Sequence, residues 1–363
     1  MMLQGHFVDT MLHPDFRKAE YGFYYVWEFM RGMTAPIFFF TTGLIFVFLL
    51  LKQSPNPYAN KRVKKGLRRG IYIIFIGYLL HLNFFAVLAL QYSNWYIAVD
   101  VLHCIGLAII AIIGLFFLSW HTRIPLTGLL LGMGLLIFYV SPIIERMAWG
   151  HLPIFFEQYM DKEHGSIFTP IPWFGFTFLG GVMGAFLHHR PKAAFQWYFP
   201  ICLAVLGFSL HYYSWHLLVG LHELTGWQPF LDLSNNNYLL WRLGHVFIVT
   251  SVIIFLCNLV KEVPSLLTKI GSETLAIYSV HYIILYGSWF GIGLAQFWRA
   301  SLSPIPCIIG AISFIIAFVF MVNYLDIIRR FRDKKIKVFL HQQYLFLKNK
   351  IQQLYLRFHL KRR

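Results

Sequence analysis

The stretch AVDVLHCIGLAIIAIIGLFFLS, residues 98–119, decides the fold class of this protein. Between Cys104 and Leu118 it contains no charged, amide or hydroxyl side chain. As a helix, a run of this length crosses the ~30 Å hydrocarbon core of a bilayer, whereas a barrel strand would be shorter and would alternate polar with apolar residues. The stretch therefore predicts a transmembrane helix.

Similar apolar runs recur along the whole chain. The expected spans are 33–51, 70–90, 98–119, 124–141, 171–187, 196–219, 239–260, 272–294 and 305–327. Hydrophobic residues make up 58% of the chain and charged residues only 13%, well below the ~25% charge of a soluble domain. We therefore expect an all-α membrane protein, a polytopic bundle of about nine visible transmembrane helices that occupies residues 1–330 as one domain.

The distribution of charge predicts how the bundle is oriented. The chain carries 31 Lys and Arg against 15 Asp and Glu. Roughly three quarters of the basic residues fall on one side of the predicted spans, and the positive-inside rule makes that side the cytoplasm. The C-terminus is then cytoplasmic, with residues 331–363 as a basic amphipathic tail on anionic lipid headgroups. Because the basic residues follow the loops of a membrane protein, we expect lipids and no nucleic acid as partners.

The first residues are unusual for this topology. Nine spans and a cytoplasmic C-terminus place residues 1–32 outside, yet no signal peptide precedes them. A further span before Met1 would remove the difficulty. We therefore expect about ten helices in all, with Met1 to His6 as the last turn of the first one.

A few ionisable side chains lie inside the predicted spans, where each one costs several kcal/mol and is a default candidate for function. They are His81, Asp100, His103, His211, His245 and His281. We expect His81 and His281 near mid-depth. A single membrane histidine is more often a hydrogen-bonded packing residue, and Asp100 and His103 can satisfy each other at i and i+3. Several histidines with an acidic partner nevertheless provide a general base and an orienting carboxylate.

No metal site is expected. The sequence contains no H-x-x-x-H or H-E-x-x-H spacing, which zinc sites on helices use. The cysteines Cys104, Cys202, Cys257 and Cys307 fall inside spans, without metal-ligand spacing, and are predicted to be apolar core residues.

Basic residues at the predicted cytoplasmic ends of spans could bind the phosphates of a cytoplasmic ligand. The candidates are Lys64, Arg68, Arg69 and Arg190. Such runs more often serve only as topology signals, so phosphate binding is one of two open interpretations.

Four segments resemble one membrane family in order and spacing. They are EFMRGMTAPIFFFTTG (Glu28–Gly43), DVLHCIG (Asp100–Gly106), PWFGFTFLGG (Pro172–Gly181) and SETLAIYSVH (Ser272–His281). Over residues 1–325 the chain resembles bacterial relatives of heparan-α-glucosaminide N-acetyltransferase, within the transmembrane acyltransferase superfamily.

The resemblance implies transfer of an acetyl or other acyl group from cytoplasmic acyl-CoA to an extracytoplasmic glycan or sugar, at a bacterial inner membrane. Acyl-CoA would be a co-substrate, with no permanently bound cofactor. His6 is similar in position to the histidine that acts as base in the superfamily. From their depth and the cost of burying polar groups, we further expect Asp9 or Glu28 to orient His6 and His281 to lie in the same chamber. The other residues expected to line it are Arg31, His81, Asp100, His103 and His245.

A transporter or flippase of a polar or lipid-linked solute is the main alternative. Helices interrupted by glycine would favour it. The glycines that suggest such interruptions are Gly114, Gly132, Gly134, Gly180, Gly181 and Gly184. A non-catalytic membrane scaffold is a third possibility. A tunnel joining both faces, narrowest at His6 or His281, would favour the acyltransferase.

Overall fold

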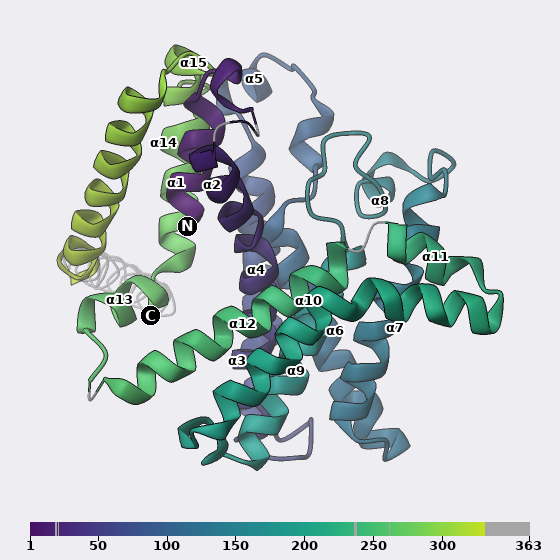
Figure 1. Cartoon of the computed structure of the whole chain (residues 1–363). Helices are drawn as coiled ribbons and strands as arrows, with labels where there is room; N and C mark the ends of the chain where they lie inside the picture. Colours follow the sequence, from purple (N-terminus) through teal and green to yellow (C-terminus); the bar gives the residue numbers. More distant parts are fainter. Residues whose placement is uncertain (19, 21, 236–237, 261, 331–363) are drawn as a thin grey trace, which may run out of the picture.

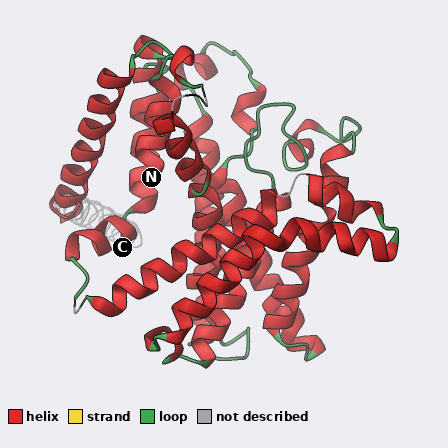
Figure 2. Cartoon of the chain, viewed as in Figure 1, coloured by secondary structure: helices red, strands yellow, loops and turns green. Residues whose placement is uncertain are grey.

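The protein is a bundle of helices (Figures 1 and 2). The computed structural model describes residues 1–330 except 19, 21, 236–237 and 261, and the predicted tail 331–363 lies outside the described residues. Within the described part there is no β-strand, only two isolated bridges between loops. The predicted all-α class is therefore confirmed.

The helices follow one another with short connections. Their bounds are α1 (Met2–Met11), α2 (Gly22–Gly32), α3 (Thr34–Leu51), α4 (Lys61–His81), α5 (Phe84–Leu88), α6 (Val101–Thr122), α7 (Leu126–Arg146), α8 (Ile154–Glu157), α9 (Pro170–His189), α10 (Tyr198–Thr225), α11 (Gln228–Asn235), α12 (Tyr238–Leu259), α13 (Ser265–Ser272), α14 (Thr274–Tyr286), α15 (Leu294–Trp298) and a last helix, Pro304–Arg330.

Seven of the described helical segments are long and apolar enough to cross a membrane. They are Gly22–Leu51, Asn94–Thr122, Leu126–Arg146, Pro170–His189, Tyr198–Thr225, Tyr238–Leu259 and Pro304–Arg330. The protein is thus a multi-pass membrane protein. The helix that carries His6 continues to Met11 rather than ending at His6 as expected.

The two remaining expected spans, 70–90 and 272–294, are not continuous helices. α4 begins in the basic segment at Lys61 and ends at His81, where Leu82 becomes extended and Asn83 caps the short α5. α14 has only 13 residues because Gly287 takes a positive φ of 74° and ends the helix. The expectation of two uninterrupted spans is therefore wrong, and His81 is the last residue of α4.

The interrupted ends of α4 and α14 satisfy each other's backbone. The amide of Trp289 donates to the carbonyl of Leu82 at 2.9 Å, and the amide of Phe84 donates to the carbonyl of Trp289 at 2.9 Å. The Trp289 indole also donates to the carbonyl of Leu79 at 2.7 Å. Irregular backbone is stable at membrane depth only where protein or water satisfies it, and this pairing provides such partners.

Glycines allow two helix pairs to approach closely. A Cβ on Gly180 or Gly184 would clash with the backbone of α3, and one on Gly106 would lie 2.5 Å from the carbonyl of Gly70 on α4. α9 remains helical through these positions, with a non-helical residue only at Ile171. Gly180 and Gly184 are therefore packing residues. A Cβ on Gly114 or Gly132 would have no neighbour within 4 Å, but α6 and α7 continue through them without a break.

Two hydrophobic clusters meet at α14. Tyr278 and Tyr282 belong to the large cluster built by α3, α4, α6, α7, α9 and α12. Ile277 and Leu285, on another face of α14, belong to a smaller cluster with α1 and the last helix. In Figure 1 this second group stands beside the main bundle. α14 therefore lies between two parts of the protein.

Candidate active site

α14 carries polar side chains on both of the faces that it buries. Tyr278, Tyr282 and Tyr286 recur at intervals of four residues, and His281 lies between them. Tyr278 reaches α6, whereas His281 and Tyr286 reach α1. One short helix thus positions side chains toward two polar clusters.

The first cluster is centred on the carboxylate of Asp100, which is only 4% exposed. Asp100 caps α6 by accepting from the amides of Leu102 at 2.8 Å and His103 at 3.3 Å. Its Oδ1 also lies 2.8 Å from Nδ1 of His103, and its Oδ2 accepts from the Tyr278 hydroxyl at 3.0 Å. The expected pairing of Asp100 with His103 is present, and it is extended to α14.

His81 joins this cluster without a hydrogen bond of its own. Its Nε2 lies 3.6 Å from Oδ2 of Asp100, and its ring lies 4.8 Å from Trp95 and 5.9 Å from Tyr282. Neither ring nitrogen of His81, nor Nε2 of His103, has a hydrogen-bond partner among the described residues. The cluster therefore retains buried polar atoms that a substrate or water could satisfy.

Tyr78 and Gly77 hold the His103 ring in place. A Cβ on Gly77 would lie 2.6 Å from the His103 ring, so only glycine leaves room for the imidazole. The Tyr78 ring packs 4.1 Å from His103, and its hydroxyl shares a 2.7 Å hydrogen bond with Tyr159 from the loop after α8. Burial raises the pKa of Tyr159, so its hydroxyl stays protonated near neutral pH.

The second cluster joins α1 to α14. Nδ1 of His6 lies 2.9 Å from the Tyr286 hydroxyl, and the His6 and His281 rings are 5.1 Å apart. His281 is fully buried, and its Nδ1 lies 3.2 Å from the carbonyl oxygen of Ile277. A carbonyl only accepts, so Nδ1 of His281 carries the proton and Nε2 carries a lone pair. That Nε2 has no partner among the described residues.

A cavity of about 640 Å³ opens beside Tyr286. Its lining residues are Asp9, Thr10, Tyr286, Ala295, Gln296 and Arg299. Asp9 forms an ion pair with Arg31 of α2. The tyrosine that bonds His6 therefore also forms part of the cavity wall.

The structure orients His6 differently from the sequence-based expectation. Asp9 pairs with Arg31, and Glu28 is exposed on α2. Among the described residues the hydrogen-bond partner of the His6 ring is Tyr286. Arg31 pairs with Asp9, which lines the cavity, but Arg31 is not itself a lining residue.

His245 belongs to a separate cluster. Its Nε2 lies 3.0 Å from Nδ1 of His211 on α10, and its ring packs against Phe29 and Trp241 at 5.0 and 4.5 Å. Arg242 lies in the same cluster. The structure thus brings together His6 with His281, and His81 with Asp100 and His103, but places His245 elsewhere.

The predicted phosphate-binding residues are all exposed, and none of them lines the cavities of about 640 and 780 Å³. They are Lys64, Arg68 and Arg69 on α4 and Arg190 after α9.

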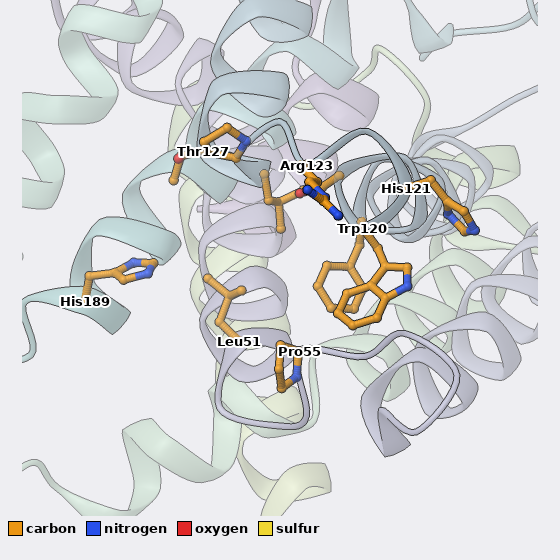
Figure 3. Close-up of a pocket in the computed structure, with 11 residues that line it drawn as sticks. Leu51, Pro55, Trp120, His121, Arg123, Thr127 and His189 are labelled. Atoms are coloured by element: carbon orange, nitrogen blue, oxygen red, sulfur yellow. The ribbon is translucent and has the colours of Figure 1, made fainter.

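A cavity of about 780 Å³ opens where the ends of α3, α6 and α9 meet the start of α7 (Figure 3). Its walls include Trp120, His121 and Arg123, with His189 on the opposite side. This cavity combines basic and aromatic side chains, and the sequence analysis did not identify it.

One group of possible metal ligands occurs in the described part of the chain. Ligand atoms of Glu157, at the end of α8, and of Glu163 and His164, in the loop after it, lie within 4.8 Å of one another. Glu157 is buried and its Oε1 lies 3.3 Å from Nε2 of His164. These side chains could hold an ion, although the contact between Glu157 and His164 also satisfies both as an ion pair.

Sequence reasoning missed the tyrosines. Tyr278 and Tyr286 make the contacts that join α14 to Asp100 and His6, and Tyr78 covers His103. The sequence did contain a sign of the α14 tyrosines: Tyr278, Tyr282 and Tyr286 recur every four residues around His281, which places them along one side of a helix.

Comparison with known proteins gives one match. A family model described as heparan-alpha-glucosaminide N-acetyltransferase, catalytic, matches residues 1–218. No curated protein and no solved structure matches the chain.

Proposed function

Because this chain belongs to the heparan-alpha-glucosaminide N-acetyltransferase catalytic family, we propose that it is a membrane acetyltransferase that uses acetyl-CoA, or another acyl-CoA, as donor. The acceptor is a hydroxyl or amine of a glycan or sugar on the outer side. The observation that carries this proposal is the His6–Tyr286–His281 cluster, which borders a polar cavity of about 640 Å³.

His6 acts as the general base in this proposal. It is half-buried behind Tyr286, which lines the cavity through which the acceptor enters, and the Tyr286 hydroxyl fixes its ring. The Nε2 lone pair of His281, on a ring 5.1 Å away, stabilises the imidazolium that forms on His6. A well-placed base of this kind contributes about 10²–10⁴-fold to the rate.

The reaction is a single acyl transfer. The acceptor oxygen or nitrogen attacks the thioester carbonyl, and its proton moves to His6. The C–S bond then breaks, the acyl group remains on the acceptor, and the CoA sulfur leaves and takes up a proton. Placing both substrates within one site supplies much of the remaining rate enhancement.

The Asp100 cluster orients the reacting helix. Asp100 holds Tyr278, which lies one turn before His281 on α14, so the carboxylate sets the rotation of that helix. His81 and His103, with their unpartnered ring nitrogens, offer polar contacts to the carbonyl end of the donor.

The donor enters from the basic side. Arg123, His121 and Trp120 line the cavity of about 780 Å³ at one end of α6, and Asp100 caps the other end. The exposed Lys64, Arg68, Arg69 and Arg190 then attract the CoA phosphates without forming the pocket. Arg123→Ala is expected to raise the KM for acetyl-CoA with little change in kcat. Arg68→Ala is expected to raise this KM less.

The basic side is the cytoplasm, and the membrane is a bacterial inner membrane with the C-terminus inside. In a cysteine-free background, Lys64→Cys should react with a membrane-impermeant maleimide only after the cells are opened, and Lys162→Cys should react in intact cells. The reverse pattern would exchange the donor and acceptor sides.

Acyl transfer is tested in membranes with radiolabelled acetyl-CoA and added glucosamine. His6→Ala is expected to lose about 10²-fold or more of the transfer, and His281→Ala to lose part of it. The matched control is His216→Ala, an exposed histidine on α10. Protein amounts are matched by immunoblot.

Full activity of His6→Ala would exclude His6 as the base. If wild-type membranes transfer no label, whereas labelled sugar crosses vesicles that contain the protein, the transporter alternative replaces the acetyltransferase.

A further inference from the structure

A buried arginine lies outside the proposed active site. Arg242, in the second turn of α12, is only 9% exposed. None of the ion pairs among the described residues includes Arg242. A charge inside a membrane span is usually paired or marks a binding site.

The surroundings of Arg242 are aromatic. Its guanidinium carbon lies 5.1 Å from the ring of Phe29, 5.2 Å from Tyr238 and 5.1 Å from Trp241. Its Nη1 donates to the carbonyl of Phe29 at 3.2 Å, and its buried Nε has no partner. Ring faces and one carbonyl attract the cation but do not neutralise it.

An imidazole on the next turn completes the donor set. His245 contacts two of the same rings, Phe29 and Trp241, and its buried Nδ1 also has no partner. Its Nε2 shares a 3.0 Å hydrogen bond with Nδ1 of His211. When His211 donates in that bond, Nδ1 of His245 carries a proton and becomes a donor beside the guanidinium.

The position of the site indicates what it binds. Arg242 lies near the start of α12, between Tyr238 and His245, with Trp241 beside it as an interfacial aromatic residue. Because the expected span begins at residue 239, this end of α12 should lie at the depth of lipid headgroups. Arginine binds phosphate through a fork of donors, and the aromatic walls suit the glycerol and upper acyl chain of a lipid.

We propose that Arg242 and His245, backed by His211, bind the phosphate of a membrane phospholipid at this end of α12. The ligand satisfies the two unpartnered nitrogens and neutralises the buried charge. The site is separate from the His6–Tyr286–His281 cluster, and the proposal does not depend on acyl transfer.

The test uses the purified full chain in dodecyl maltoside, with the thermal midpoint Tm measured with and without dihexanoyl phosphatidylglycerol. Wild-type protein is expected to gain about 2 °C or more at saturating lipid, and Arg242→Met to gain nothing. Without lipid, Arg242→Met should be at least as stable as wild type, because an unneutralised buried charge has been removed. Arg146→Met, which removes an exposed charge of the same kind, should keep the full lipid response.

Three results would overturn the proposal. The Tm of Arg242→Met could lie below that of wild type by the same amount with and without lipid, which would indicate a purely structural arginine. Wild type could fail to respond to lipid. Sodium phosphate at equal concentration and ionic strength could produce the same shift, which would indicate a site for free phosphate. If Arg242→Met does not accumulate, His245→Gln replaces it: several-fold weaker lipid binding supports the site, and unchanged binding refutes it.

Discussion

Replacing Asp100 should expose how much of the fold depends on one carboxylate. Asp100→Ala removes the cap of α6, which is worth about 1 kcal/mol, and the bond from Tyr278, which is worth about 0.6–1.7 kcal/mol between membrane helices. It also leaves the buried donors on His103 and Tyr278 unsatisfied, at about 1–3 kcal/mol. The expected loss in the free energy of unfolding is about 3–5 kcal/mol.

Two controls separate these contributions. Asn83→Ala removes a cap from α5 without an interhelical bond and should cost about 1 kcal/mol. Tyr278→Phe removes only the bond to Asp100 and should cost about 1 kcal/mol. The measurement is reversible unfolding in mixed micelles with increasing dodecyl sulfate. The reasoning fails if Asp100→Ala costs no more than Asn83→Ala, or if Tyr278→Phe costs as much as Asp100→Ala.

Two further predictions concern packing and pH. Gly180→Val should sharply reduce the amount of folded protein, because the valine side chain would meet the α3 backbone. Gly132→Val, which has open space around it, should accumulate normally. Equal amounts of the two variants by fluorescence-detected chromatography would contradict this prediction. The hydrogen bond from Arg146 holds the pKa of Asp232 below its ordinary value, so their ion pair stabilises the protein above about pH 4 and is lost as the pH falls through the folded pKa. The difference in Tm between wild type and Arg146→Met should therefore vanish on acidification, and an undiminished difference at about pH 3 would exclude the pair as its source.

Hydropathy alone predicted the class and most helices of this protein. The expected span 98–119 corresponds to α6, and the start of that helix has a local cause, since Asp100 and His103 form a capping box at its first turn. The same criterion failed at 70–90 and 272–294. The residues after His81 and Tyr286 remain apolar although the backbone there is irregular, and hydropathy does not distinguish a helix from a loop that the same apolar surroundings cover. Gly287 was the local sign of an ending.

The candidate site was harder to predict because its contacts join distant parts of the chain. Asp100 and His103 are three residues apart, and their pairing followed from helix geometry. His6 and Tyr286 are 280 residues apart, and Asp100 and Tyr278 are 178 apart. Such contacts depend on how helices pack, which one sequence does not specify. The free-energy cost of burying an ionisable side chain in a span identified His281 as a candidate. The same argument gave no reason to prefer Tyr286 over Asp9 as the partner of His6.

The shortness of α14 has a consequence for the distance an acyl group must travel. A helix of 13 residues is about 20 Å long, roughly two thirds of the ~30 Å hydrocarbon thickness. Beyond Tyr286 the backbone is irregular and hydrogen-bonded, and the cavity of about 640 Å³ reaches that tyrosine. In the proposed function this cavity lies on the acceptor side, so the path along α14 is shorter than a full span. In the proposed reaction a thioester entering from the basic side meets its acceptor partway across, and neither substrate has to traverse the full membrane.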